Sequence, residues 1–142
     1  MPAIADPGAS VVRAAHTLGI EVQPLIGPVS LMLALSASGL NGQNFAFIGY
    51  VPSEPTLRAQ RIKALEALAL KTGQTQMCIE TPYRNEALLR TLLEVLQPGT
   101  RLAVSMGLTL ETCRHYSGTP QEWKRAKWVL NKQTPAVFAI GS

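Results

Sequence analysis

The stretch PLIGPVSLMLALSASG, from Pro24 to Gly39, decides the fold, because it leads from a short predicted strand through a Gly27-Pro28 turn into an apolar helix. Pro28 suits the first position of a helix, since it has no N–H to leave unpaired and its φ angle is preset. Gly27 has no side-chain oxygen, so the N–H groups of Val29, Ser30 and Leu31 in the first turn stay free for a ligand. The stretch therefore predicts a ligand-binding helix entrance or, alternatively, an ordinary core helix. Because the helix is apolar on nearly every face, we expect burial on several sides.

Strand and helix patterns alternate along the rest of the chain. Predicted strands span Glu21–Leu25, Phe45–Tyr50, Gln76–Glu80, Leu102–Met106, Thr112–Ser117 and Ala136–Ile140. Helices are predicted to begin at Asp6-Pro7, Gly27-Pro28, Thr81-Pro82 and Thr119-Pro120, and one more to span about Pro55–Thr72. The segment Asn85–Leu96, after Thr81-Pro82, has its leucines on one helical face. Glu54 and Arg58 have the spacing of an ion pair across one helical turn. The pattern predicts an α/β fold: a mixed sheet of about five strands with flanking helices, in which the last strands enter antiparallel.

Four segments occur in an order that has a counterpart in a known family. They are MPAIADPG (Met1–Gly8), PLIGPVS (Pro24–Ser30), ETPYRNE (Glu80–Glu86) and TPAVFAIG (Thr134–Gly141). Together they resemble the tetrapyrrole methylase superfamily, whose members use S-adenosylmethionine. The branch most similar to them methylates a ribose 2'-oxygen of bacterial small-subunit ribosomal RNA. Ile26, Val29-Ser30 and Tyr83 depart from the usual residues of these motifs.

The resemblance implies a domain division. It covers the later part of such an enzyme, so residues 1–26 are expected to be a remnant of a first α/β domain and residues 27–142 the second, carboxyl-terminal domain. The glycine-rich turn and the Gly-Gly-Asp loop of the family's first domain have no counterpart in this sequence. The chain by itself is therefore expected to bind the methyl donor weakly and to be inactive.

The resemblance also implies a set of ligand-binding residues. Cofactor contacts, mostly through the main chain, are expected at Gly27, Val29, Ser30, Glu80, Thr81, Met106, Leu108, Pro135 and Ala136. Asp6 is a candidate substrate residue or a helix cap. Arg84 is a candidate for binding an RNA phosphate or the donor's carboxylate, or a partner of Glu80 or Glu86. The sequence identifies no general base.

Composition limits the classes that remain. Of the 142 residues, 46% are hydrophobic and 15% charged, which excludes a disordered chain and favours a domain that hides surface against another domain or subunit. No apolar run is long enough to span a bilayer, and the amino terminus lacks the basic segment of a signal peptide. The expected location is the cytoplasm, and the resemblance implies a homodimer.

The cysteines and histidines do not form a metal-ligand pattern. Cys78 and Cys113 are far apart and no CxxC or Cys/His spacing occurs, so no metal is expected. Cys78 lies in an apolar run and is predicted to be a buried, inert thiol. His16 and His115 are predicted to be structural or surface residues.

The net charge of +4 is compatible with an anionic partner such as RNA. Basic residues cluster at Arg58–Lys63 and again at Lys124–Lys132, where Trp123 and Trp128 are interleaved with them. Such a pattern fits base stacking with phosphate contacts, or a solvated helix face whose indole rings pack inward. A tetrapyrrole acceptor and a non-catalytic dimerisation module remain the alternatives to ribosomal RNA methylation.

Overall fold

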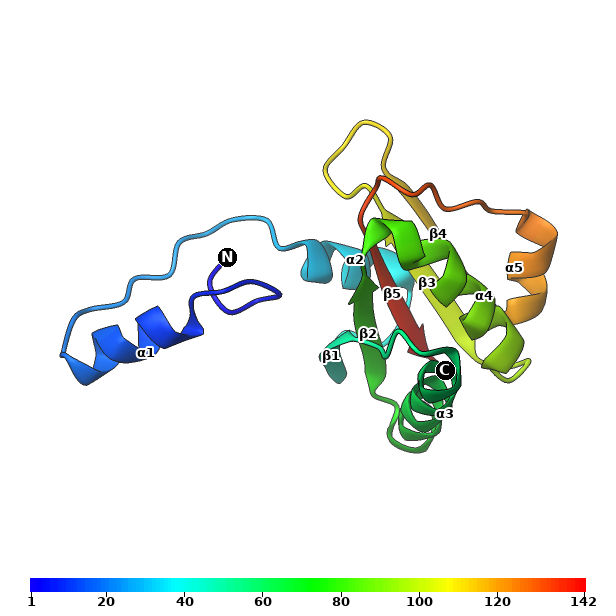
Figure 1. Ribbon diagram of the computed structural model, residues 1–142, viewed down its shortest axis with the longest axis horizontal. Helices are drawn as coiled ribbons and strands as arrows, with labels where there is room; N and C mark the ends of the chain where they lie inside the picture. Colours follow the sequence, from blue (N-terminus) through cyan, green and yellow to red (C-terminus); the bar gives the residue numbers. More distant parts are fainter.

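The computed structural model describes residues 1–142 and contains one sheet with helices on both of its faces (Figure 1). The elements, in chain order, are α1 (Ala9–Thr17), α2 (Ser30–Ser38), β1 (Phe45–Tyr50), α3 (Pro55–Thr72), β2 (Thr75–Glu80), the short 3-10 helix η1 (Pro82–Arg84), α4 (Asn85–Val95), β3 (Arg101–Met106), β4 (Arg114–Gly118), α5 (Pro120–Ala126) and β5 (Ala136–Gly141).

The sheet is mixed, as the sequence predicted. Its five strands have the order β1-β2-β5-β3-β4; β1 and β2 run parallel, and the other neighbours run antiparallel. The last strand of the chain thus inserts between β2 and β3. Because Ala136 at the start of β5 pairs with Glu80 on one side and with Met106 on the other, the predicted ligand-binding strand ends meet at one edge of the sheet.

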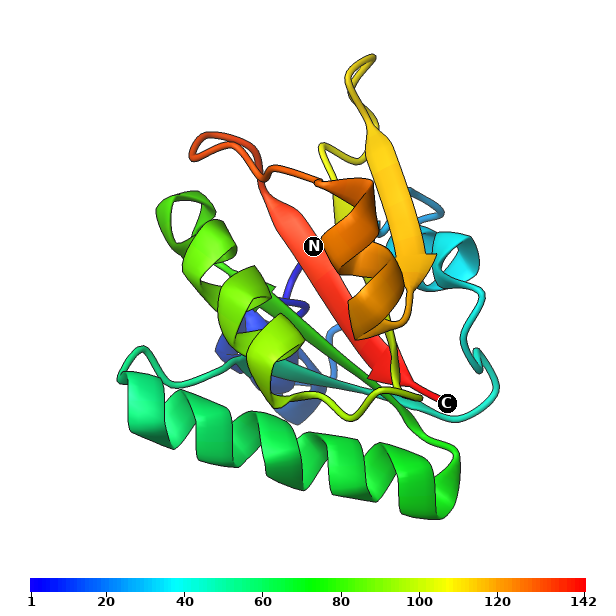
Figure 2. The ribbon, with the colours of Figure 1, turned by 90° about the vertical axis from the view of Figure 1, so that its right-hand side faces the viewer.

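Each face of the sheet has its own apolar core. Helices α3, α4 and α5 cover one face, where Ile62, Leu88 and Phe138 are fully buried (Figure 2). Helix α2 covers the other face with Leu31, Ala34 and Leu35, which pack against Met77, Ala103, Val137 and Ala139. Alternate residues of a strand therefore belong to opposite cores, as the period of two requires.

The helix signals were partly right. Helix α5 begins where Thr119-Pro120 predicted it, and Thr119 and Glu122 form the expected capping box. Helix α3 spans Pro55–Thr72 as predicted, but Glu54 does not pair with Arg58: its carboxylate accepts hydrogen bonds from the N–H groups of Thr56 and Leu57 at 2.9 and 2.6 Å.

Two helices start later than predicted. Helix α2 begins at Ser30, and Val29, in extended conformation, precedes it, so Pro28 lies outside the helix. Helix α1 begins at Ala9 because Gly8 has a φ of 122°, which ends the turn containing Pro7. Helix α2 is buried on one face only: Met32 is 42% and Leu33 36% exposed.

The first part of the chain forms an arm that extends away from the sheet (Figure 1). Helix α1 has no buried residue, and the chain from Leu18 to Val29 is irregular. The strand predicted at Glu21–Leu25 is therefore wrong: it has no neighbouring strand to pair its N–H and C=O groups. No helix has the length and apolarity that crossing a membrane requires.

Candidate functional site

A cavity of about 620 Å³ lies at the edge of the sheet where β1, β2 and β3 end and β5 begins. Its lining is mainly apolar. The lining residues are Ala5, Ser30, Leu31, Tyr50, Ile79, Glu80, Thr81, Pro82, Gly107, Leu108, Leu110, Pro135, Ala136 and Val137. Clefts at the carboxyl ends of strands are the usual place for ligands in α/β sheets.

One wall of the cavity is the start of α2. Val29 makes no side-chain cap to this helix, and no acidic residue occurs in the first turn. The N–H groups of Ser30 and Leu31 are therefore without an intrahelical acceptor beside the cavity that both residues line. These donors and the positive end of the helix dipole suit an oxygen or a ring nitrogen of a ligand.

Six of the nine residues expected to contact a cofactor line this cavity: Ser30, Glu80, Thr81, Leu108, Pro135 and Ala136. The other three, Gly27, Val29 and Met106, do not. Met106 is turned to the opposite face of the sheet, where its side chain joins the core under α3–α5, whereas Val29 packs on the core under α2. Their contact with a ligand stays a prediction.

Sequence reasoning missed several lining residues, among them Tyr50, Ile79 and Val137. Ile79 and Val137 are cross-strand partners on the face covered by α2, so their side chains reach the floor of the cavity. The alternation of side chains along a strand could have identified both: each is next to a predicted site residue, Glu80 or Ala136, and therefore points to the other face of the sheet. Tyr50 ends β1 and lies 57% exposed at the rim.

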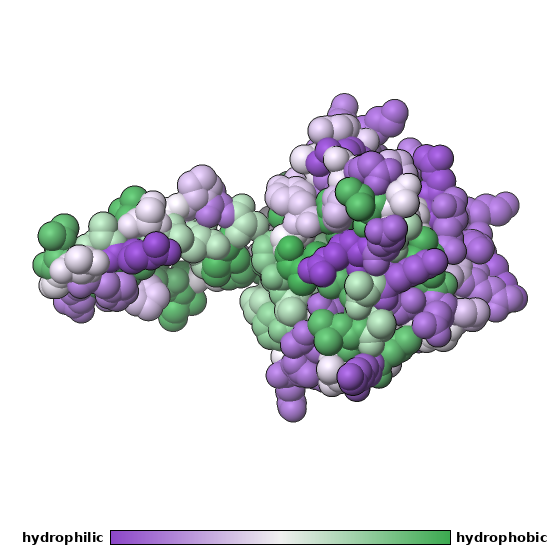
Figure 3. Space-filling view, turned by 60° about the horizontal axis from the view of Figure 1, so that its bottom comes forward, coloured by the Kyte–Doolittle hydropathy of each residue, from purple (hydrophilic) through white to green (hydrophobic).

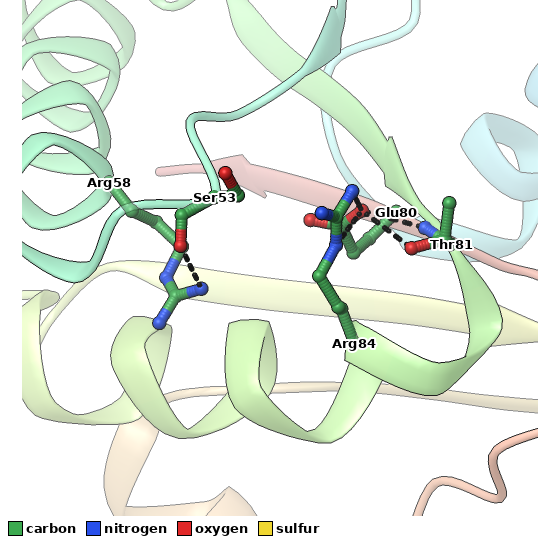
Figure 4. Close-up of polar contacts among 5 residues, drawn as sticks. All are labelled: Ser53, Arg58, Glu80, Thr81 and Arg84. Atoms are coloured by element: carbon green, nitrogen blue, oxygen red, sulfur yellow. Dashed lines mark hydrogen bonds and ion pairs between the residues drawn. The ribbon is translucent and has the colours of Figure 1, made fainter.

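Glu80 contributes to the rim, but its carboxylate is engaged with Arg84 (Figure 4). The Oε1 atom accepts hydrogen bonds from Arg84 Nε at 3.0 Å and Nη2 at 2.8 Å, and also from the backbone N–H and the hydroxyl of Thr81. The hydrogen bonds between Arg84 and Glu80 raise the pKa of the Arg84 guanidinium above its usual value. Of the interpretations open for Arg84, the pair with Glu80 is thus formed, and Arg84 does not line the cavity.

Arg58 is a second cation near this edge, shown beside Ser53 in Figure 4. Only 7% of Arg58 is exposed; it donates to Thr91 Oγ1 at 3.1 Å and to the carbonyl oxygen of Ser53 at 3.4 Å. It ties the loop after β1 to α4 and is a structural cation.

Asp6 lies on the arm and does not line the cavity, although its neighbour Ala5 does. Its carboxylate pairs with the amino terminus of Met1 at 3.2 Å and makes no cap to α1, because the turn at Gly8 separates the two. The prediction that Asp6 caps this helix is wrong, and its role toward a substrate stays a prediction.

The tryptophans of the basic segment pack inward. Trp123 is 2% exposed, and its Nε1 donates to the carbonyl oxygen of Leu102 at 2.7 Å. Trp128 lies edge-on to Trp123 and beside Tyr116, and the Arg114 guanidinium lies 4.7 Å from the centre of its ring. Base stacking on Trp123 is therefore excluded, and the inward-packing interpretation is right for this ring. Trp128 follows the end of α5 and is only partly buried.

Cys78 is the buried thiol that the sequence predicted. Burial raises the pKa of Cys78 to about 12, which keeps this thiol protonated. His115 is exposed and both of its ring nitrogens have partners, as predicted for a structural or surface residue: Nδ1 lies 2.9 Å from Ser105 Oγ and Nε2 lies 3.1 Å from Cys113 Sγ. No group of three or more His, Cys, Asp or Glu side chains is arranged to hold a metal ion.

Solved structures share this architecture. Uroporphyrin-III C-methyltransferase from Thermus thermophilus, in a complex with S-adenosylhomocysteine, superposes with a TM-score of 0.54 at 18% identity, over 99% of this chain and 62% of that one. At this identity the likeness is one of fold, and the fold is that of the tetrapyrrole methylases.

Sequence relatives narrow the class, although no protein-family profile matches the chain. Ribosomal RNA small subunit methyltransferase I from Pseudomonas aeruginosa is 36% identical over 115 residues, 80% of this chain and 39% of that protein. The protein of the same name from Leptospira borgpetersenii is 32% identical over 139 residues, 96% of this chain and 53% of that protein. The chain is therefore related in sequence to the ribosomal RNA small subunit methyltransferases I, and its fold is that of the tetrapyrrole methylases. It spans about half or less of the length of these relatives.

Proposed function

We propose that this chain is part of a cytoplasmic S-adenosylmethionine-dependent methyltransferase that acts on a ribose of small-subunit ribosomal RNA. The observation that carries the proposal is the cavity that gathers Ser30, Thr81, Leu108 and Ala136 from four separate segments beside an uncapped helix start. Two further facts support it: the relatives at 32–36% identity are ribosomal RNA methyltransferases by name, and a structure of the same fold holds S-adenosylhomocysteine.

The residues of the cavity fit a nucleoside. A volume of about 620 Å³ is within the range of pockets that enclose small molecules. The apolar side chains of Leu31, Ile79 and Val137 suit the faces of a purine ring, and the N–H groups of Ser30 and Leu31 suit its acceptors. Ligand contacts through the backbone tolerate changes of side chain, which explains how the motifs here depart from the family pattern.

The cofactor, when bound, supplies a methyl group on a sulfonium. For this reaction the protein needs to align the donor with the acceptor oxygen and to exclude water. In this chain the apolar floor of the cavity excludes water, and the uncapped turn of α2 orients the ligand. The hydrogen bonds of Glu80 to Thr81 and Arg84 hold the turn that forms the rim.

A substitution at Ser30 tests this site without disturbing the helix. Ser30 is the first residue of α2, and Val29 before it has φ −120° and ψ 116°, a conformation that a following proline accepts. Ser30→Pro removes the N–H and the hydroxyl, whereas Ser30→Ala removes the hydroxyl alone. Titration of S-adenosylhomocysteine into the chain is expected to show about tenfold weaker binding for Ser30→Pro than for Ser30→Ala, the effect of one hydrogen bond. Equal affinities of the two variants, or no binding by the wild type at millimolar ligand, would contradict the proposal.

A tetrapyrrole acceptor is the second candidate, because the Thermus neighbour is a uroporphyrin-III C-methyltransferase. Transfer of a radiolabelled methyl group by the complete enzyme to small-subunit ribosomal RNA, with uroporphyrinogen III as the competing acceptor, separates the two. Label in the tetrapyrrole and none in the RNA would reject the RNA acceptor and keep the methyltransferase.

We also propose that residues 1–26 belong to a first domain, that residues 27–142 form the second, and that the protein is a homodimer. Helix α1 has no buried residue, and Met32 and Leu33 on α2 are exposed. This exposed apolar surface supports the proposal, because another domain or subunit would cover it. Light scattering tests the dimer. A strict monomer at high concentration would reject it and would also argue against a dimerisation module.

A further inference from the structure

The net positive charge of the chain comes from one segment. Residues 101–132 contain six Lys or Arg residues and two acidic residues, Glu111 and Glu122, whereas the rest of the chain has equal numbers of both signs. The net charge of +4 therefore belongs entirely to β3, β4, α5 and the loop that follows α5. We name these six cations the basic stripe: Arg101, Arg114, Lys124, Arg125, Lys127 and Lys132.

The cations of the basic stripe are exposed and lack acidic partners. All six are exposed, and the two salt bridges in the structure lie elsewhere, at Asp6 and at Glu80. Glu122 is occupied by its capping box; Arg101 and Arg125 lie near enough to help lower its pKa. Unpaired cations on one surface create a field that attracts a polyanion.

Arg114 is held in place for such a contact. Its guanidinium lies over the ring of Trp128, which in turn packs against Tyr116 and Trp123. A guanidinium stacked on an aromatic ring keeps its N–H edges free, and it loses little freedom when these bind the oxygens of a phosphate. The aromatic cluster thus supports a phosphate contact instead of stacking on a base.

The basic stripe leads to the cavity. Arg114 pairs in the sheet with Met106, directly before the cavity residues Gly107 and Leu108. Lys132 lies in a loop held by Asn131 Oδ1, which accepts from the N–H groups of Gln133 and Thr134, and the loop continues into the cavity residue Pro135. In Figure 3, hydrophilic residues gather on the side of the molecule away from the arm, where Figure 1 places α5.

We propose that the basic stripe is a docking surface for the phosphate backbone of RNA, which it guides to the cavity. The inference rests on the proposed function, because it places the RNA acceptor relative to the methyl-donor cavity. RNA is favoured over an anionic membrane because α5 has no large apolar side chain exposed for insertion into lipid: its exposed residues are Gln121, Glu122, Lys124, Arg125 and Ala126. Val129, in the loop after α5, is the single large apolar side chain exposed between the cations Lys127 and Lys132. Contacts to phosphates alone predict binding that depends steeply on salt and little on sequence.

The test compares two charge reversals of equal size. Lys124, Arg125 and Lys127 are changed together to Glu; the matched control changes Arg61, Lys63 and Lys71, which are exposed on α3. Binding of a fluorescein-labelled RNA stem-loop is measured by anisotropy from 50 to 300 mM salt. At about 0.1 M salt we expect the stripe reversal to weaken binding on the order of 10²-fold and to lower the salt slope by roughly 2–3, as the loss of three phosphate contacts does. The α3 reversal is expected to have a much smaller effect.

Circular dichroism checks that each variant is folded. If Glu at Lys124, Arg125 and Lys127 unfolds α5, a second variant with Gln at the same three positions removes the charges without reversing them. Equal loss in both reversals would overturn the inference, and so would wild-type binding to phosphatidylserine vesicles without binding to the stem-loop. S-adenosylhomocysteine titration of the same variants separates the two proposals. If the stripe reversal binds both S-adenosylhomocysteine and RNA as tightly as the wild type does, only the docking surface is rejected. If the stripe reversal weakens RNA binding but the wild type does not bind S-adenosylhomocysteine, only the cavity is rejected.

Discussion

Glu80 holds Arg84 through one carboxylate oxygen. Oε1 accepts hydrogen bonds from Nε and Nη2 of Arg84, while Oε2 is buried without a partner. The Glu80 side chain is fully buried and that of Arg84 is 32% exposed. The pair joins the end of β2 to the first turns after it. The turn that forms the rim of the cavity is therefore held in place from the face of the sheet opposite α2.

Glu80→Gln is expected to destabilise the protein. The variant keeps an acceptor oxygen but loses the charge that strengthens the bonds to Arg84 and Thr81, and we expect a loss of about 2 kcal/mol in the free energy of unfolding. Urea denaturation measures it. Glu86→Gln, exposed one turn further on, is the control, with an expected change within about 0.5 kcal/mol. Equal changes in both variants would show that the pair adds nothing to stability.

The two thiols are expected to differ in reactivity. Cys78 is 7% exposed, and burial raises its pKa to about 12, whereas Cys113 is partly exposed on the loop before β4. With a chromogenic disulfide reagent at pH 8 we expect one thiol to react in the native protein and both in denaturant. Cys113→Ser should abolish the native reaction. Fast modification of Cys78 in the folded state would be inconsistent with its burial.

Trp123→Phe is expected to cost about 1–2 kcal/mol of stability, because the indole N–H that binds the buried carbonyl oxygen of Leu102 is lost. Thermal unfolding measures it, and Trp128→Phe, which keeps an aromatic ring under Arg114, is the milder control. The same Trp123 variant is expected to leave RNA affinity unchanged. Weakened RNA binding by a well-folded Trp123→Phe protein would show that the ring contacts RNA after all.

Acid is expected to destabilise α3 and α5 through their caps. Hydrogen bonds from Leu57 and Thr56 lower the pKa of Glu54, and those from Thr119 lower that of Glu122. The unfolded chain therefore binds protons more readily at these carboxylates, so their stabilisation is complete above the ordinary glutamate pKa and is lost as the pH falls through the lowered value. Thermal melts between pH 7 and pH 3 should fall less steeply for Glu54→Gln than for the wild type. The exposed Glu94→Gln is the control and should follow the wild-type curve.

Much of the sheet could be predicted from local patterns. The strands at Phe45–Tyr50 and Thr75–Glu80 agree with their predicted bounds within one residue, because each is a short run with apolar residues that turn residues bound on both sides. Helix starts depended on caps: Thr119-Pro120 was right because the capping box is local, whereas Gly27-Pro28 placed the start of α2 two residues early. The strand at Glu21–Leu25 failed because a strand exists only where another chain segment pairs with it.

By itself, the sequence determined the alternation of strands and helices, the mixed sheet and the superfamily, because these depend on periodicity, caps and short motifs within the chain. Only the tertiary structure decided that Glu80 faces Arg84 away from the α2 core, that Met106 points to the opposite face from Val137, and that Trp123 is buried. Which face of the sheet a side chain occupies follows from pairing between strands distant in the sequence, and a single residue of register reverses it.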